Sequence, residues 1–68
     1  MPEGYFVQVR KQQKKELLEF LRGSDKNLEQ SIALFSFKTG LKVSTINTYI
    51  DELKQAGLLK VESGYPVL

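Results

Sequence analysis

Residues 36–61, SFKTGLKVSTINTYIDELKQAGLLKV, hold the pattern that decides the fold of this chain. Apolar residues recur there every three or four positions, as they do along one face of a helix. They are Ile46, Tyr49, Ile50 and Leu53, and Gly57 closes the series. Gly40, which precedes this segment, is typical of a tight turn after an earlier helix. The stretch therefore predicts the end of one helix, a turn, a second helix, and a strand after Gly57.

The opposite face of the second predicted helix is polar. It carries Ser44, Asn47, Thr48, Asp51 and Lys54. This face begins with small hydrogen-bonding side chains, whereas an ordinary solvated helix carries long charged ones. A helix with an apolar back and a short polar front, held against a preceding helix by a glycine turn, has the geometry that enters a DNA major groove.

The ordered pattern resembles the helix-turn-helix of winged-helix DNA-binding domains. The residues that carry the resemblance are Ser36 four positions before Gly40, Leu41 after it, the triplet Ser44-Thr45-Ile46, and the closing phrase formed by Leu53, Gly57, Leu58 and Leu59. Two positions depart from the family pattern, because Lys42 replaces a short N-capping residue and Phe37 replaces a polar one. The resemblance implies a winged helix that binds double-stranded DNA.

The composition favours one small binding domain over an enzyme. The chain has 68 residues, and a domain of this size buries only about 60% of its unfolded surface. It contains neither cysteine nor histidine, so the usual thiol nucleophile, general base and imidazole metal ligand are all missing. We therefore expect no catalytic activity and no cofactor.

The location of the protein is predicted from the same composition. No apolar run approaches the roughly 20 residues that span a membrane, and the N-terminus lacks the pattern of a secretory signal. A cytoplasmic protein is the expectation.

The net charge of +2 is concentrated at the N-terminus. Residues 1–22 carry five basic and three acidic residues, whereas the remaining residues balance at five against five. A phosphate-binding surface must therefore be assembled by folding, which can bring Lys38, Lys42 and Lys60 to one side.

The whole chain is predicted to be one mainly α domain with a small β-hairpin, a winged helix-turn-helix over residues 1–68. Its expected elements are helices over about 9–22, 28–39 and 43–56 and a hairpin over about 58–68. Residues 5–8 fit either an extended segment or an added helical turn.

The ends of the predicted helices carry recognisable capping residues. Gly23 is expected to end the first helix as a left-handed cap, and Asn27 with Gln30 resembles a capping box. The expected core is Leu17, Leu21, Ile32, Phe35, Ile46, Ile50 and Leu53.

The polar face of residues 43–56 is the predicted DNA-binding site. Asn47 can pair with an adenine edge, and Ser44 or Thr48 can meet base edges or a thymine methyl group. Thr45 and Lys42 are placed for phosphates. Asp51 and Glu52 lie further along and would be repelled by phosphates, so only the first half of the helix is expected to enter the groove.

Two further features have open interpretations. The basic run RKQQKKE, residues 10–16, can be a second phosphate contact or, as we favour, a solvated face with a Lys15–Glu19 pair. Tyr65 can touch the minor groove or DNA backbone, or can pack across the hairpin.

These features together predict sequence-specific binding of double-stranded DNA by a small transcriptional regulator. A homodimer is expected, with Phe37, Tyr5 or Phe6 in its interface, because a small core leaves apolar surface that needs a cover. The alternatives are a winged-helix protein–protein interaction module and a DNA-binding domain that belongs to a larger protein.

Overall fold

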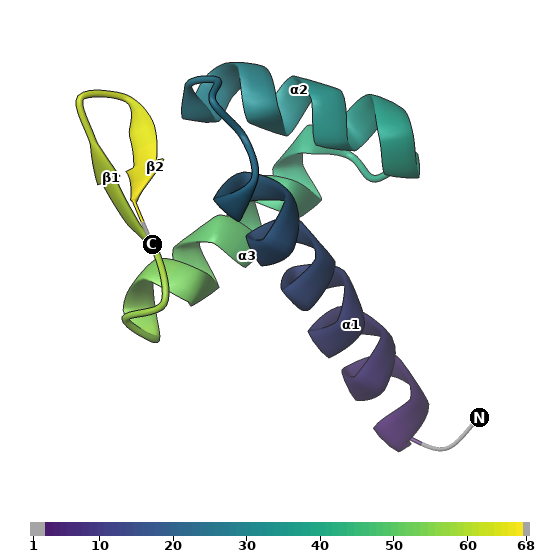
Figure 1. The fold of residues 1–68 in the computed structure, drawn as a ribbon. Helices are drawn as coiled ribbons and strands as arrows, with labels where there is room; N and C mark the ends of the chain where they lie inside the picture. Colours follow the sequence, from purple (N-terminus) through teal and green to yellow (C-terminus); the bar gives the residue numbers. More distant parts are fainter. Residues whose placement is uncertain (1–2, 68) are drawn as a thin grey trace.

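The computed structural model describes residues 3–67, with side chains described for residues 8–67. Three helices are followed by a two-stranded antiparallel hairpin (Figure 1). The elements are α1 (Glu3–Arg22), α2 (Leu28–Thr39), α3 (Val43–Gln55), β1 (Lys60–Glu62) and β2 (Tyr65–Val67). This is the winged helix-turn-helix layout that the sequence predicts. Over the described range, no helix combines the length and the apolarity that a membrane crossing requires.

The predicted boundaries hold for α2, and α3 ends one residue earlier than predicted. The predicted start of α1 at Val9 is wrong, since the helix begins at Glu3. Residues 5–8 therefore form helix and not an extended segment. Their strand-like composition is overridden because they continue the helical segment of α1, and β propensity is weak when tertiary context favours another structure. In Figure 1 the N-terminal half of α1 projects away from the other elements.

The core lies where the three helices meet. Its buried residues are Leu17, Leu21, Phe35, Ile46, Tyr49, Ile50, Leu53 and Leu59. Six of the seven predicted core residues are among them. Ile32, the seventh, is only half-buried but packs against this cluster. Ser31 and Phe35, one helical turn apart, form the inward face of α2, and Ile32 lies beside that face.

Gln13 interrupts the apolar stripe of α1 for a reason that only the fold reveals. The hydroxyl of Tyr49, a residue 3% exposed, donates a hydrogen bond of 2.6 Å to Gln13 Oε1. A buried hydroxyl without a partner would be destabilising. Gln13 therefore satisfies the polar end of a core tyrosine on α3.

The turn between α2 and α3 is fixed by Ser36 and Gly40. Gly40 has φ 76°, a left-handed conformation that favours glycine, and its N–H donates to Ser36 O at 2.8 Å. The Ser36 hydroxyl reaches across the turn and donates to Leu41 O at 2.6 Å. A small hydroxyl residue four positions before the glycine thus ties both sides of the turn together.

Gly57 and Gly23 end their helices differently. Gly57 has φ 76°; its N–H donates to Lys54 O, and the N–H of Leu58 donates to Leu53 O, the bond pattern of a Schellman motif. Gly23 was expected to adopt the same left-handed form, and that prediction is wrong because its φ is not positive. α1 instead ends with a tightened turn in which Ser24 N–H donates to Leu21 O at 3.2 Å.

Two N–H groups at the start of α2 donate hydrogen bonds outside the helical ladder, one to the N-cap side chain and one to the wing. The N–H of Gln30 donates to the Asn27 side chain at 2.8 Å, as the capping pattern predicts. The N–H of Leu28, in the first turn, has no partner within its helix and donates to Gly64 O in the hairpin turn at 2.7 Å. This bond attaches the tip of the wing to α2.

The wing is shorter than predicted. Its strands pair Lys60 with Val67, Val61 with Pro66, and Glu62 with Tyr65, so residues 58 and 59 precede the hairpin. Leu68 lies outside the described residues. Ser63 and Gly64 form the turn with φ 54° and 80°, the two positive angles of a type I′ turn.

Candidate nucleic-acid interface

α3 presents two faces of opposite character. Its apolar back is buried against α1 and α2, as expected, and its polar front is exposed to solvent. The exposed front residues are Ser44, Asn47, Thr48, Asp51, Lys54 and Gln55. The two charged ones, Asp51 and Lys54, lie beyond the first two turns, which therefore offer neutral hydrogen-bonding groups. The structure therefore brings together the predicted base-contacting residues on one accessible surface.

The N-terminus of α3 is suited to an anion. Lys42 occupies the N-cap position with φ −69° and ψ 145°, and its side chain makes no capping hydrogen bond. The first turn contains no acidic residue, so its backbone N–H groups are not offset by a carboxylate. These N–H groups lack partners within the helix, and the positive end of the helix dipole lies here. Lys42 is exposed and Thr45 is half-buried.

The hydroxyl of Thr48 is already engaged by its own helix. It donates to Ser44 O at 3.0 Å. Its proton is therefore directed to the backbone, which leaves the oxygen lone pairs and the methyl group for an approaching ligand. This chemistry suits a base-edge donor or a thymine methyl group.

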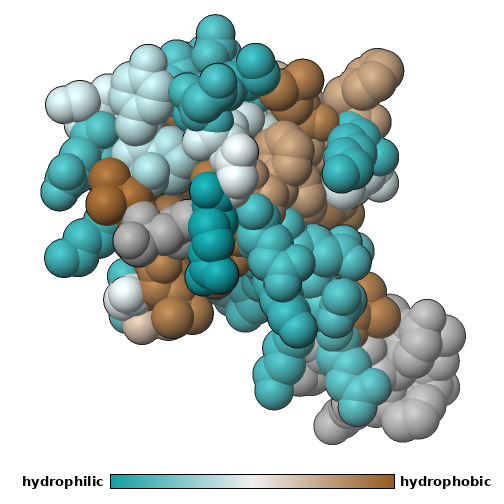
Figure 2. Space-filling model, in the orientation of Figure 1, coloured by the Kyte–Doolittle hydropathy of each residue, from teal (hydrophilic) through white to brown (hydrophobic). Residues whose placement is uncertain are grey.

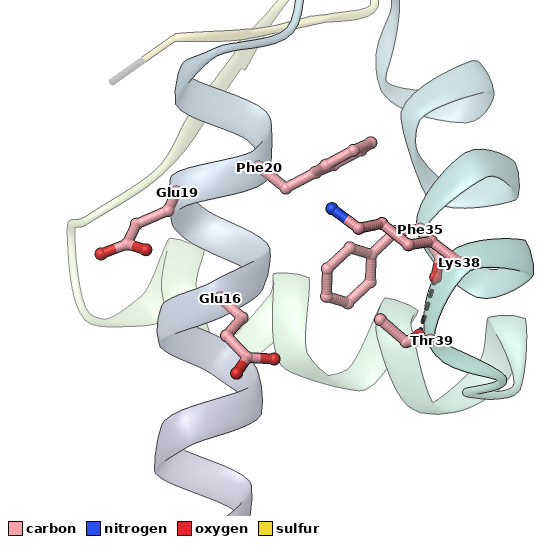
Figure 3. Close-up of a pocket in the computed structure, with 6 residues that line it drawn as sticks. All are labelled: Glu16, Glu19, Phe20, Phe35, Lys38 and Thr39. Atoms are coloured by element: carbon pink, nitrogen blue, oxygen red, sulfur yellow. Dashed lines mark hydrogen bonds between the residues drawn. The ribbon is translucent and has the colours of Figure 1, made fainter.

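Lys38 does not join the front of α3. Its ammonium lies 5.8 Å from the centroid of the Phe20 ring on α1, in a cavity of about 500 Å³ that Glu16, Glu19 and Phe35 also line (Figure 3). An ammonium over an aromatic face is stabilised there by the ring quadrupole. The fold thus directs Lys38 toward α1, away from its predicted phosphate role.

Lys60 and Tyr65 both lie on the wing and are exposed. Lys60 is in β1 and pairs with Val67 across the hairpin. Tyr65 is 51% exposed and lines a shallow hollow of about 310 Å³ with Leu28 and Glu29 of α2. Tyr65 therefore stands at the junction of wing and α2, with half of its surface accessible.

The basic run on α1 makes one ion pair to another helix. Lys14 Nζ lies 3.7 Å from Glu52 Oε1 on α3. The predicted Lys15–Glu19 pair is wrong, because within the described side chains no ion pair joins these two residues. Glu52 is consequently held toward α1 and does not share the front with Asp51. Neighbouring Arg10 lies 6.0 Å from the centroid of the Tyr49 ring.

Gln55 lies on the front of α3 although it was not predicted there. It is exposed and lies four positions after Asp51, on the same helical face. Extending the polar series by one more turn identifies it. Its amide can both donate and accept hydrogen bonds, so it adds neutral polar surface beyond Asp51.

Comparisons of the chain with protein-family models, with curated proteins and with solved structures gave no match. The class of protein that the molecule defines is therefore the one described by its own geometry: a winged helix-turn-helix with an exposed, mostly neutral polar face on α3.

Proposed function

We propose that this chain binds double-stranded DNA through the front of α3 and acts as a small transcriptional regulator in the cytoplasm. In this proposal Ser44, Asn47 and Thr48 contact base edges. Lys42, Thr45 and Lys60 contact phosphates, and Tyr65 lies against the DNA backbone. The proposed role is binding alone, without catalysis or a cofactor.

The observation that carries the proposal is the asymmetry of α3. Four of its residues, Ile46, Tyr49, Ile50 and Leu53, are at most 5% exposed, whereas its front is open to solvent. The buried side fixes the helix rigidly, and the exposed side offers short side chains that can approach base edges closely. A face of this kind differs from a solvated helix face, which long lysine and glutamate side chains usually cover.

The depth of insertion follows from the charges along α3. Its first turn has no acid and an uncapped N-terminus beside Lys42, which favours a phosphate at that end. Asp51 is exposed on the same front and is repelled by phosphates. In the proposed complex the N-terminal half of α3 enters the major groove and the C-terminal half remains outside.

A salt titration tests this function against the alternative of a protein–protein module. Affinity for a fluorescent duplex of arbitrary sequence is measured by anisotropy at several salt concentrations. DNA binding through phosphates predicts that the logarithm of affinity falls linearly with the logarithm of salt concentration. An adaptor would bind the duplex weakly at every salt concentration. A flat, weak response therefore excludes the DNA-binding proposal.

We also propose that the protein binds DNA as a homodimer. Phe37 is 92% exposed and Leu34 is 42% exposed on α2. In Figure 2, hydrophobic surface gathers over the end of α2, whereas the coloured residues of the projecting part of α1 are mostly hydrophilic. The side chains of Tyr5 and Phe6, the other predicted interface residues, lie outside the described residues. Sedimentation at increasing concentration tests this, and a monomer throughout would exclude the dimer.

A further inference from the structure

A second surface feature lies between α1 and the C-terminal end of α3. It is a groove of about 290 Å³ whose floor is formed by Leu18, Leu53, Ala56 and Leu58. Leu58 is 54% exposed, Ala56 is exposed and Leu18 is half-buried, whereas Leu53 belongs to the core. The floor therefore exposes apolar surface at Leu58, Ala56 and Leu18, which favours a partner that can cover it.

The rim of this groove is basic. Lys11, Lys14 and Lys15 of α1 line it, and Glu52 of α3 is the acid among the lining residues. Three ammonium groups and one carboxylate give the rim a net charge of +2. Lys14 is paired with Glu52, and in the part of the chain with described side chains no carboxylate lies within ion-pair distance of Lys11 or Lys15. Two cations thus remain for an external anion.

The groove is separate from the front of α3. Glu52 follows Asn47 by five residues, which places the two about 140° apart around the helix. Asn47 is on the exposed front, whereas Glu52 points toward Lys14 on α1. The groove and the front therefore lie on different sides of α3.

We infer that this groove binds an acidic amphipathic helix of a partner protein. The floor matches leucine-type side chains on one face of such a helix, and the rim matches carboxylates flanking that face. Lys11 and Lys15 are four residues apart, about 6 Å along α1, which is also the rise between carboxylates at positions i and i+4 of a partner helix.

Other occupants match the groove less well. DNA phosphates would satisfy the lysines but would leave the leucine floor without an apolar partner. A second copy of this chain would have to offer its exposed Leu34 and Phe37, and these lie beside Lys38, which has the same charge as the rim. The combination of an apolar floor and a cationic rim therefore favours an acidic helical segment of a different protein.

The test uses a designed peptide with leucines at positions i, i+4 and i+7 and glutamates on both flanks. A scrambled peptide of the same composition is its control. Amide chemical shifts of the isotopically labelled chain should change at Leu18, Leu53 and Leu58 with the designed peptide, and should stay unchanged at Ser44 and Asn47. The scrambled peptide should produce no comparable shifts.

Two sets of variants test whether the apolar floor and the basic rim each contribute to peptide binding. Leu58→Ser should weaken peptide binding about tenfold, since it removes an exposed apolar contact. The double variant Lys11→Glu, Lys15→Glu should abolish peptide binding. Lys54→Glu reverses a charge on the front of α3, outside the lining of the groove, and should leave peptide binding intact. All four positions are exposed, so each variant should keep the circular dichroism spectrum of the parent.

Four outcomes would overturn the inference. The scrambled peptide could bind as tightly as the designed one. The Leu58→Ser variant could bind the designed peptide as tightly as the parent protein does. The Lys11→Glu, Lys15→Glu variant could retain peptide binding but lose duplex binding, which would make the run a phosphate contact. Groove residues could shift with protein concentration alone, which would make a second copy the occupant. The outcomes measured with the peptides, with Leu58→Ser and with protein concentration do not depend on whether α3 binds DNA.

Discussion

The helix-turn-helix unit and the wing are stabilised in different ways. α2 and α3 supply five of the buried core residues, and Ser36 and Gly40 fix the turn between them. The wing strands contain no buried residue, since only Val61 and Pro66 are even half-buried. The wing is held by Leu59, which precedes β1 and is 2% exposed, and by the bond from Leu28 N–H to Gly64 O. Packing therefore stabilises the helical unit, and a few anchors stabilise the wing.

The largest effect should come from removing core packing in the helical unit. Leu53→Ala should lower the free energy of unfolding by about 2–5 kcal/mol, because it leaves a cavity in a small domain. Leu53 is 5% exposed. Chemical denaturation measures the loss. Leu58→Ala, at a residue 54% exposed, is the matched control and should change stability by less than about 0.5 kcal/mol. Equal effects of the two substitutions would contradict the burial pattern.

Base recognition should depend on the helical unit and not on the wing. Asn47→Ala should cost about 1–3 kcal/mol of binding free energy on a selected duplex and relax the preference at one base pair. Asp51→Ala, on the same front, should leave binding unchanged or tighten it, since it removes repulsion from phosphates. Anisotropy titrations on selected and scrambled duplexes measure both. Parent-like binding by Asn47→Ala on both duplexes would show that it makes no base contact.

The turn of the helical unit should be sensitive to backbone strain. Gly40→Ala should destabilise the domain by about 1–2 kcal/mol, because φ 76° is unfavourable for a residue with a Cβ atom. The added Cβ would meet no atom within 4 Å, so the cost arises from the backbone alone. Gly23→Ala is the control and should be neutral or stabilising, since φ at Gly23 is not positive. Thermal denaturation distinguishes them, and a stable Gly40→Ala protein would refute the assigned turn.

Phosphate contacts should be shared between the two regions. Lys42→Ala in the helical unit and Lys60→Ala in the wing should each weaken binding to all duplexes about equally. Each should also reduce the magnitude of the salt slope by roughly one. Lys38→Ala should leave the slope unchanged, since its ammonium lies over Phe20. If Lys60→Ala left the magnitude of the salt slope unchanged, the wing would make no phosphate contact there. If Lys38→Ala reduced it, Lys38 would contact a phosphate despite its position over Phe20.

The smallest effect should come from the turn of the wing. Ser63→Asn should raise the free energy of unfolding by about 0.5 kcal/mol, because asparagine accepts the positive φ of a type I′ turn more readily than serine. Ser63→Val should have the opposite effect, since a β-branched residue is strained at φ 54°. Thermal denaturation of both proteins is the measurement. The same direction of change for both would indicate a different turn.

The fold was predictable because its main signals are local. The spacing of Ile46, Ile50 and Leu53 defines a buried helical face, and the positions of Ser36 and Gly40 define a turn, without knowledge of any distant contact. The polar front of α3 follows from the same periodicity, which is why Ser44, Asn47 and Thr48 were predicted together. A hairpin was correctly predicted for the wing, but its strands were predicted too long, since short strands and a Ser-Gly turn are weak local signals.

Contacts between elements were decided by the tertiary structure alone. The sequence determined which residues share a helical face, because that depends only on the period of the helix. It did not determine that Gln13 accepts a hydrogen bond from the Tyr49 hydroxyl. Nor did it determine that Lys14 rather than Lys15 forms an ion pair, or that the Lys38 ammonium lies over the Phe20 ring. Each of these depends on which helices pack together and on their relative rotation, and that geometry is set only when the whole core assembles.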